Sequence, residues 1–208
     1  YMFTGMLLAL LGAFMAYVFR MQLAFPGQVV PGWGVVSPGQ YNMLITNHGS
    51  IMIFWVAMPV LIAGFGNYLI PLMCGADDMV FPRLNRLSYQ LFLLSVIVLF
   101  VSLVAQNGGF GGAWTAYPPL SANKDYNLTP WGASLWLVAV ALEFVAFLLG
   151  GINFIVTAMN SRAPGMKAFD VPIVIWMIVV ASILFMASVG PLIAGAVMLL
   201  FDQQLGTG

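Results

Sequence analysis

Five long apolar segments follow one another along this chain of 208 residues, and each is long enough to cross a bilayer as a helix. A membrane-spanning helix needs about 20 predominantly apolar residues. The segments are 1–23, 43–73, 87–105, 133–159 and 171–201. Ten-residue stretches that alternate polar and apolar residues, as in a membrane β-barrel, do not occur. We therefore expect an all-α polytopic transmembrane helix bundle that forms a single domain over residues 1–208.

The composition excludes several other classes of protein. Hydrophobic residues make up 62% of the chain and charged residues 6%, a balance that no soluble domain of this size presents to water. Six basic residues against six acidic ones argue against nucleic-acid binding, which needs a basic surface. The single cysteine, Cys74, cannot build a disulfide framework or a site of several thiolates. The chain starts at Tyr1 without a signal-peptide pattern, so we interpret it as a piece of a longer polypeptide.

Basic residues are concentrated on one side of the expected bundle. The loop after the second segment carries Arg83 and Arg86, and the loop after the fourth segment, on the same side, carries Arg162 and Lys167. The other side has Lys124 in a loop and Arg20 at the end of the first segment. Since cytoplasmic loops are enriched in lysine and arginine, we expect the side with four to be cytoplasmic. The Pro/Gly-rich loops 25–40 and 106–132 would then lie outside, and such loops are not expected to be spanning helix.

A stripe of small residues runs along the first segment, at spacings that place its members on one helix face. They are Gly5, Ala9, Gly12, Ala13 and Ala16. The stripe has two interpretations, close packing against another helix or contact with a flat partner molecule. It leads to Arg20, and an arginine near the end of a span either reaches the interface or finds a buried acceptor.

His48 lies near the outer start of the second segment, at a depth similar to that of Arg20, because consecutive spans are antiparallel. The two residues could share one site. A neutral imidazole is a good ligand for haem iron and other metals. A lone histidine in a helix bundle also commonly serves only as a hydrogen-bonding residue, so His48 alone leaves both interpretations open.

Acidic and amide residues gather towards the inner side. Asp78, next to Asp77, follows His48 by 30 residues, or about 45 Å of α-helix, which is enough to cross the bilayer. Near the inner ends of the spans are further polar residues, Asn67, Asn85, Ser88 and Asn153. These residues are either an ordinary solvated surface with ion pairs or the lining of a file of water that conducts protons.

Glu143 lies in the middle of the fourth segment, where an ionised carboxylate costs roughly 2 to 4 kcal/mol. We therefore expect its carboxyl to be protonated or partnered. Such a residue is a candidate for function, although a partner on another subunit would explain it equally well.

Several motifs resemble those of one family. Segment 48–85 reads HGSIMIFWVAMPVLIAGFGNYLIPLMCGADDMVFPRLN, segment 114–120 reads WTAYPPL, segment 151–154 reads GINF, and Asp202 stands near the end of the fifth span. This pattern resembles subunit I of the haem-copper oxygen reductases, the cytochrome c and quinol oxidases, over essentially the whole chain. The resemblance implies that the chain corresponds to an N-terminal fragment, helices one to five of a subunit with about twelve.

The resemblance implies a haem site on the outer side. His48 matches an axial ligand of the low-spin haem, expected to be haem A, and is the one metal ligand expected in this chain. Arg20 matches an arginine that hydrogen-bonds a side chain of this haem. Tyr41 and Trp114 match residues at the haem propionates.

The resemblance also implies a proton path on the inner side, called the D pathway. Asp78 matches the aspartate that opens it, and Tyr1 matches a tyrosine near its entrance. The polar residues expected along it are Asn67, Asn85, Ser88 and Asn153. Where the family often has two serines in the fourth helix, this chain has Ala146 and Phe147. We hypothesise that the carboxyl of Glu143, within one turn of them, replaces the lost hydroxyls.

No residue of the catalytic centre itself is expected here, because in the family the copper ligands, the histidine of the high-spin haem and a cross-linked tyrosine come from later helices. For the whole protein the resemblance implies a terminal oxidase that reduces dioxygen to water, with a high-spin haem and copper besides the low-spin haem, and that pumps protons. Implied partners are oxidase subunits II and III, membrane lipid, and cytochrome c or quinol as electron donor. The implied location is the bacterial cytoplasmic membrane or, alternatively, the mitochondrial inner membrane.

Three alternatives remain at this stage. In a secondary transporter, Asp78 and Glu143 would couple ion movement and the Gly/Pro breaks would be gates. A nitric oxide reductase of the same superfamily and a purely structural membrane subunit are the other two.

Overall fold

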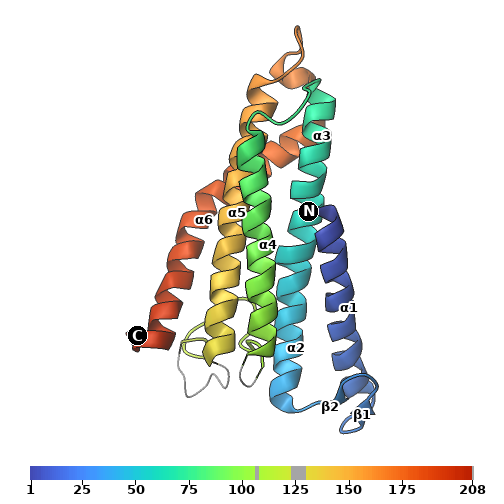
Figure 1. Cartoon of the computed structure of the whole chain (residues 1–208), viewed down its shortest axis with the longest axis vertical. Helices are drawn as coiled ribbons and strands as arrows, with labels where there is room; N and C mark the ends of the chain where they lie inside the picture. Colours follow the sequence, from blue (N-terminus) through green and yellow to red (C-terminus); the bar gives the residue numbers. More distant parts are fainter. Residues whose placement is uncertain (106–107, 123–129, 208) are drawn as a thin grey trace.

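The structure is a computed structural model that describes residues 1–105, 108–122 and 130–207. Five long helices lie side by side along one axis (Figure 1). In chain order the elements are α1 (Met2–Ala24), β1 (Val29–Val30), β2 (Gly34–Val35), α2 (Pro38–Ser50), η1 (Ile51–Gly64), α3 (Phe65–Cys74), α4 (Pro82–Val104), α5 (Pro130–Asn160), the short 3₁₀ turn η2 (Ala168–Asp170) and α6 (Ile173–Leu205). Elements α2, η1 and α3 form one continuous helical rod.

The expected all-α transmembrane class is confirmed. Within the described residues, five helical stretches are long and apolar enough to cross a membrane: 2–24, 38–74, 82–104, 131–160 and 173–205. The expectation that the loops 25–40 and 106–132 contain no spanning helix is wrong at the end of each loop, because α2 begins at Pro38 and α5 at Pro130. Ser37 caps α2 by accepting a hydrogen bond from the Gln40 amide at 3.3 Å, and the Gln40 side chain accepts one from the Ser37 amide at 3.0 Å. This capping box starts the helix at Pro38.

The middle of the second span is wound more loosely than an α-helix. Segment η1 is π-helical, and just after it the Phe65 amide donates to the Val60 carbonyl, five residues back. Pro59 lies inside this segment and carries no amide hydrogen, so the usual bond to the preceding turn cannot form there. More residues per turn give a shorter rise, so the 45 Å expected from His48 to Asp78 is an overestimate.

The small-residue stripe of α1 is divided between two environments. Gly5 and Gly12 are buried against η1, where an added Cβ would lie 2.6 Å from the Val60 side chain and 2.6 Å from the Met52 sulfur. Helix packing is therefore the correct interpretation for the two glycines, which let α1 approach closely. Ala13 is exposed instead, and Ala9 and Ala16 are half-buried.

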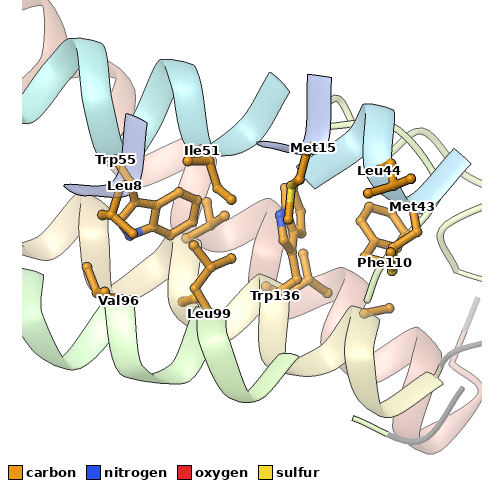
Figure 2. Close-up of a cluster of buried hydrophobic side chains, with 14 of the residues drawn as sticks. Leu8, Met15, Met43, Leu44, Ile51, Trp55, Val96, Leu99, Phe110 and Trp136 are labelled. Carbon is orange, nitrogen blue, oxygen red and sulfur yellow. The ribbon is translucent and has the colours of Figure 1, made fainter. Parts of the chain in front are cut away.

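A large apolar core joins α1, α2, η1, α4 and α5 (Figure 2). Trp55 from η1 is completely buried there, and its indole Nε1 donates to the Ser95 hydroxyl of α4 at 2.9 Å. Trp136 of α5 lies nearer the end of the bundle with hairpin β1–β2, which we call the outer end after the expected orientation, and donates to the Ser50 hydroxyl at 3.2 Å. Both tryptophans thus fill the core without leaving a buried donor unpaired.

Two loops meet at one end of the bundle. The Ala163 amide, after α5, donates to the Cys74 carbonyl at the end of α3 at 2.8 Å. This end therefore carries Arg162 and Lys167 in the loop after α5, together with Asp78 before α4. Arg83 and Arg86, expected in a loop, lie instead in the first turns of α4 at the same end. Hairpin β1–β2 and the C-terminus of the described chain lie at the opposite end (Figure 1). Lys124, which entered the count of basic residues, lies outside the described residues, and the cytoplasmic position of the basic end remains a prediction.

Candidate functional site

The orientation of His48 is determined by a backbone group of α1. Its Nδ1 lies 2.9 Å from the Gly12 carbonyl oxygen. A carbonyl oxygen can only accept, so Nδ1 carries the hydrogen and, in the neutral ring, Nε2 keeps a free lone pair. A backbone carbonyl holding the other ring nitrogen is the usual support of a metal-binding histidine. The half-buried imidazole is therefore suited to ligate a metal through Nε2.

Phe19 of α1 connects two of the expected site residues. Its ring packs edge-on against the His48 imidazole with centroids 5.4 Å apart, and against the Tyr41 ring at 6.4 Å. Tyr41 and His48 are thereby aligned along α2. Sequence reasoning missed Phe19, because a phenylalanine in an apolar helix carries no distinguishing pattern.

Trp114 lies beside α2 on a loop that is tied to that helix. The Ala113 amide donates to the Thr46 hydroxyl at 3.0 Å, and the Asn47 side-chain amide donates to the Phe110 carbonyl at 2.9 Å. A Cβ added at Gly49 would lie 3.7 Å from the Trp114 ring, which is 46% exposed. The loop thus holds an accessible indole next to the residue that follows His48.

Arg20 is exposed at the outer end of α1, and Ala13, two turns earlier, is exposed as well. The described residues contain no group of three or more His, Cys, Asp or Glu side chains that could hold a metal ion by themselves. A haem iron needs only one protein ligand on each face, and its macrocycle is flat and apolar. His48 suits one face of such a group, and its contacts on α1, Gly12 and Phe19, are the sequence neighbours of the exposed residues Ala13 and Arg20.

On the inner side, four of the expected path residues line one open cleft of about 360 Å³. They are Tyr1, Asn67, Asp78 and Asn85, and the cleft is completed by Pro82, Arg86 and Tyr89. Asp78 is exposed and accepts a hydrogen bond from the Met79 amide at 2.7 Å. The side-chain oxygens of Asn67 and Asn85 are buried and have no hydrogen-bond partner among the described residues. An acceptor without a protein partner, on a side chain that lines a cleft, can bind water when the amide turns towards the cleft.

Ser88 is buried on α4 and bonded to Tyr1. The Tyr1 hydroxyl lies 2.5 Å from the Ser88 hydroxyl, which lies 2.7 Å from the Ala146 carbonyl of α5. The carbonyl can only accept, so Ser88 donates to it and Tyr1 donates to Ser88. The lone pairs of the Tyr1 oxygen remain available on the cleft side.

Asn153 has a different position from the other amides. Its side-chain oxygen accepts from the Phe81 amide at 3.0 Å, and its side-chain nitrogen donates to the Phe81 carbonyl at 3.2 Å. Thr157, one turn later, accepts from the Val80 amide at 3.1 Å. Both side chains hold the loop before α4 in place, and Asn153 is not part of the cleft lining.

Glu143 of α5 is completely buried, with 0% of its surface exposed. Neither carboxyl oxygen has a hydrogen-bond partner among the described residues. The Ser88 hydroxyl, which is bonded to Tyr1, reaches α5 at the Ala146 carbonyl, three residues after Glu143. Glu143 is thus a buried acid less than one helical turn from the Ser88 contact.

Comparisons with known proteins agree over the whole chain. The family model described as "Cytochrome C and Quinol oxidase polypeptide I" matches residues 1–208. The alternative cytochrome c oxidase subunit 1 of Bradyrhizobium diazoefficiens is 38% identical over 207 residues, which cover 100% of this chain and 34% of that protein.

Two further relatives are similar to the same extent. The cytochrome c oxidase subunit 1 of Eremothecium gossypii is 40% identical over 201 residues, 95% of this chain and 36% of that protein. The cytochrome c oxidase subunit 1 of Thermostichus vulcanus is 39% identical over 207 residues, 100% of this chain and 36% of that protein. The chain spans about a third of the length of these curated relatives.

Proposed function

The chain belongs to the family of cytochrome c and quinol oxidase polypeptide I, and from that premise we propose that it is part of the catalytic subunit of a haem-copper terminal oxidase. In this proposal the whole enzyme reduces dioxygen to water and pumps protons. The chain contributes a ligand of the low-spin haem and the entrance of a proton-uptake path.

The observation that carries the haem assignment is the hydrogen bond from His48 Nδ1 to the Gly12 carbonyl, which leaves Nε2 free to ligate iron. Arg20 would pair with a polar substituent of the haem, here proposed to be haem A, and Tyr41 and Trp114 would contact its propionates. A low-spin haem, when bound, supplies a one-electron carrier. The role of His48 is to ligate, and that of the Gly12 carbonyl is to orient the imidazole.

The inner cleft supports the second part of the proposal. Asp78 at the exposed mouth attracts protons, while the free oxygens of Asn67 and Asn85 hold water behind it. From the cleft, the hydroxyls of Tyr1 and Ser88 continue the row of polar groups into the bundle. Asn153 acts on the path indirectly in this proposal, by fixing the Phe81 backbone at the start of α4.

The remaining cofactors and partners follow from the family. The high-spin haem and copper would be held by parts of the oxidase outside this chain. Subunits II and III would complete the enzyme, and cytochrome c or quinol would supply electrons. Its place would be the bacterial cytoplasmic membrane or the mitochondrial inner membrane.

Spectroscopy and oxygen consumption of the purified oxidase that contains this chain test the proposal. We expect a reduced-minus-oxidised haem spectrum, consumption of dioxygen on addition of reduced cytochrome c or quinol, and acidification outside reconstituted vesicles. A colourless protein that moves a solute across vesicles would contradict the proposal and favour a transporter.

A further inference from the structure

Glu143 is a buried acid for which the described residues supply no partner. Its carboxyl oxygens are buried and neither is hydrogen-bonded. Buried side-chain polar groups are nearly always paired, and an unpaired acid inside a membrane protein carries a particularly high free-energy cost. A protein keeps such a costly group where the group has a function, so the contacts around Glu143 indicate what that function is.

The nearest chemistry is the hydroxyl pair at the end of the inner cleft. Ser88 donates to the carbonyl of Ala146, which stands three residues after Glu143 on α5. Tyr1, which lines the cleft, donates to Ser88. The hydroxyl pair therefore extends from the cleft to α5, at a point less than one turn from Glu143.

Apolar and aromatic side chains surround the rest of this region. Phe144 and Phe147, close to Glu143 on α5, are buried. The ring centroid of each lies 5.8 Å from that of Phe185 on α6. Tyr1 packs against Phe92 of α4 at 5.3 Å. The polar link from the cleft towards Glu143 is the hydroxyl pair of Tyr1 and Ser88.

We propose that Glu143 is a proton-carrying carboxyl beside the inner cleft, which exchanges protons with the cleft water by way of Tyr1, Ser88 and a water molecule between Ser88 and the carboxyl. In each exchange an O–H bond of a protonated water in the cleft breaks and an O–H bond on the carboxylate of Glu143 forms, with no net change in electrons. The hydroxyls of Tyr1 and Ser88 and the linking water each release one proton as they accept another, and Ser88 turns its hydrogen from the Ala146 carbonyl towards that water. This inference rests on the proposed proton-uptake path and gives the carboxyl of Glu143 a proton-carrying role of its own.

The test uses the complete oxidase that contains this chain. Glu143→Gln keeps the shape of the side chain and removes its titrating proton, and Glu143→Asp keeps a carboxyl. Ser182→Ala is a control for the loss of a buried hydroxyl, because the bond that this hydroxyl forms among the described residues goes to the Ile178 carbonyl of its own helix. The readouts are the infrared difference spectrum on reduction, in which a protonated carboxyl gives a C=O band that shifts in D₂O, and the rate of proton uptake.

We expect the wild-type and Ser182→Ala enzymes to show the carboxyl band and the Glu143→Gln enzyme to lack it. Proton uptake should slow by about 10²-fold in Glu143→Gln, in line with the loss of one positioned acid–base group, and recover in part in Glu143→Asp. An unchanged band together with unchanged uptake in Glu143→Gln would overturn the inference.

Tyr1→Phe provides a second, independent variant if Glu143→Gln does not assemble. It removes the hydroxyl and keeps the ring that packs against Phe92, so the bundle should form. We expect the carboxyl band to shift and proton uptake to slow, and an unchanged band with unchanged uptake would refute the role of the pair. Failure of the proposed function gives a different result, a wild-type protein without a haem spectrum or oxygen consumption.

Discussion

Two groups of buried polar side chains, one at each end of the bundle, are paired in different ways. At the outer end, an outer cluster is formed by Ser121, Ser134, Gln203 and Gln204. Gln203 is 1% exposed, accepts from the Ser134 hydroxyl at 2.8 Å and donates to the Ser121 carbonyl at 2.7 Å. Gln204 donates to the Ser134 hydroxyl at 2.7 Å. Protein groups bind protein groups throughout this cluster.

In the inner cleft, by comparison, some polar atoms are not paired with protein groups. Asn67 donates to the Ala63 carbonyl at 2.7 Å, but its side-chain oxygen and that of Asn85 have no partner among the described residues. A saturated polar cluster stabilises a fold, whereas polar atoms left open beside a cleft bind water and can take part in proton transfer. The difference teaches that polar residues of one membrane bundle divide into structural and functional groups according to whether the protein itself satisfies them.

The largest effect is expected at the mouth of the cleft. Asp78→Asn should slow proton uptake in reconstituted vesicles by about 10²-fold, because the titrating group at the entrance is lost. Stability should not change, since Asp78 is exposed and the asparagine oxygen can still accept from the Met79 amide. Uptake at the wild-type rate would remove the cleft from the proton path.

A second prediction concerns the packing of α1, which supports both ends of the bundle. Tyr1, just before this helix, bonds to Ser88 at the inner cleft, and its Gly12 carbonyl orients the His48 imidazole. Gly5→Ala places a Cβ 2.6 Å from the Val60 side chain. The overpacking should lower the free energy of unfolding by about 1–3 kcal/mol, measured by denaturant titration in detergent. Gly190→Ala is the control, because nothing lies within 4 Å of the added Cβ. Equal stability of both variants would contradict the close α1–η1 contact.

A substitution in the outer cluster should change the stability of the protein and leave proton uptake unchanged. Gln203→Leu removes two hydrogen bonds, to Ser134 and Ser121, and should lower the free energy of unfolding by about 1 kcal/mol. Proton uptake should stay at the wild-type rate. A loss of uptake with unchanged stability would reverse the assignment of the two ends.

The smallest change in stability is expected inside the cleft. Asn85→Ala should shift the free energy of unfolding by less than about 0.5 kcal/mol, because its side-chain oxygen forms no bond within the described protein. Proton uptake should nevertheless fall, since the side chain lines the cleft. The pair Gln203→Leu and Asn85→Ala therefore separates stability from function, and a stability loss in Asn85→Ala as large as in Gln203→Leu would show that this amide is structural.

Sequence patterns predict the coarse organisation of this chain well. Long apolar runs predict the five spans, because in a membrane every backbone polar group must be satisfied within the helix. The loop positions predict that the basic residues of two loops, with Asp78, meet at one end. Four of the polar residues expected on the path do line one cleft.

The details that depend on contacts between helices could not be read from the sequence. Pro59 signals a disturbance in the second span but not that the winding there becomes π-helical. Asn153 and Asn67 are both asparagines near inner helix ends, yet one binds the Phe81 backbone and the other leaves its oxygen free. Phe19 reaches His48 only because Gly12 lets α1 approach α2 and η1. Side-chain partners of this kind are set by packing and not by residue type.

The haem assignment of His48 supports the whole functional account, and its replacement tests that account most directly. In the complete oxidase, His48→Ala should abolish the low-spin haem signal in the optical and electron paramagnetic resonance spectra, because the Nε2 ligand is lost. Gln203→Leu should keep the signal at full strength, because the hydrogen bonds of Gln203 go to Ser134 and Ser121 and not to the imidazole. A low-spin signal that survives intact in His48→Ala would contradict the account.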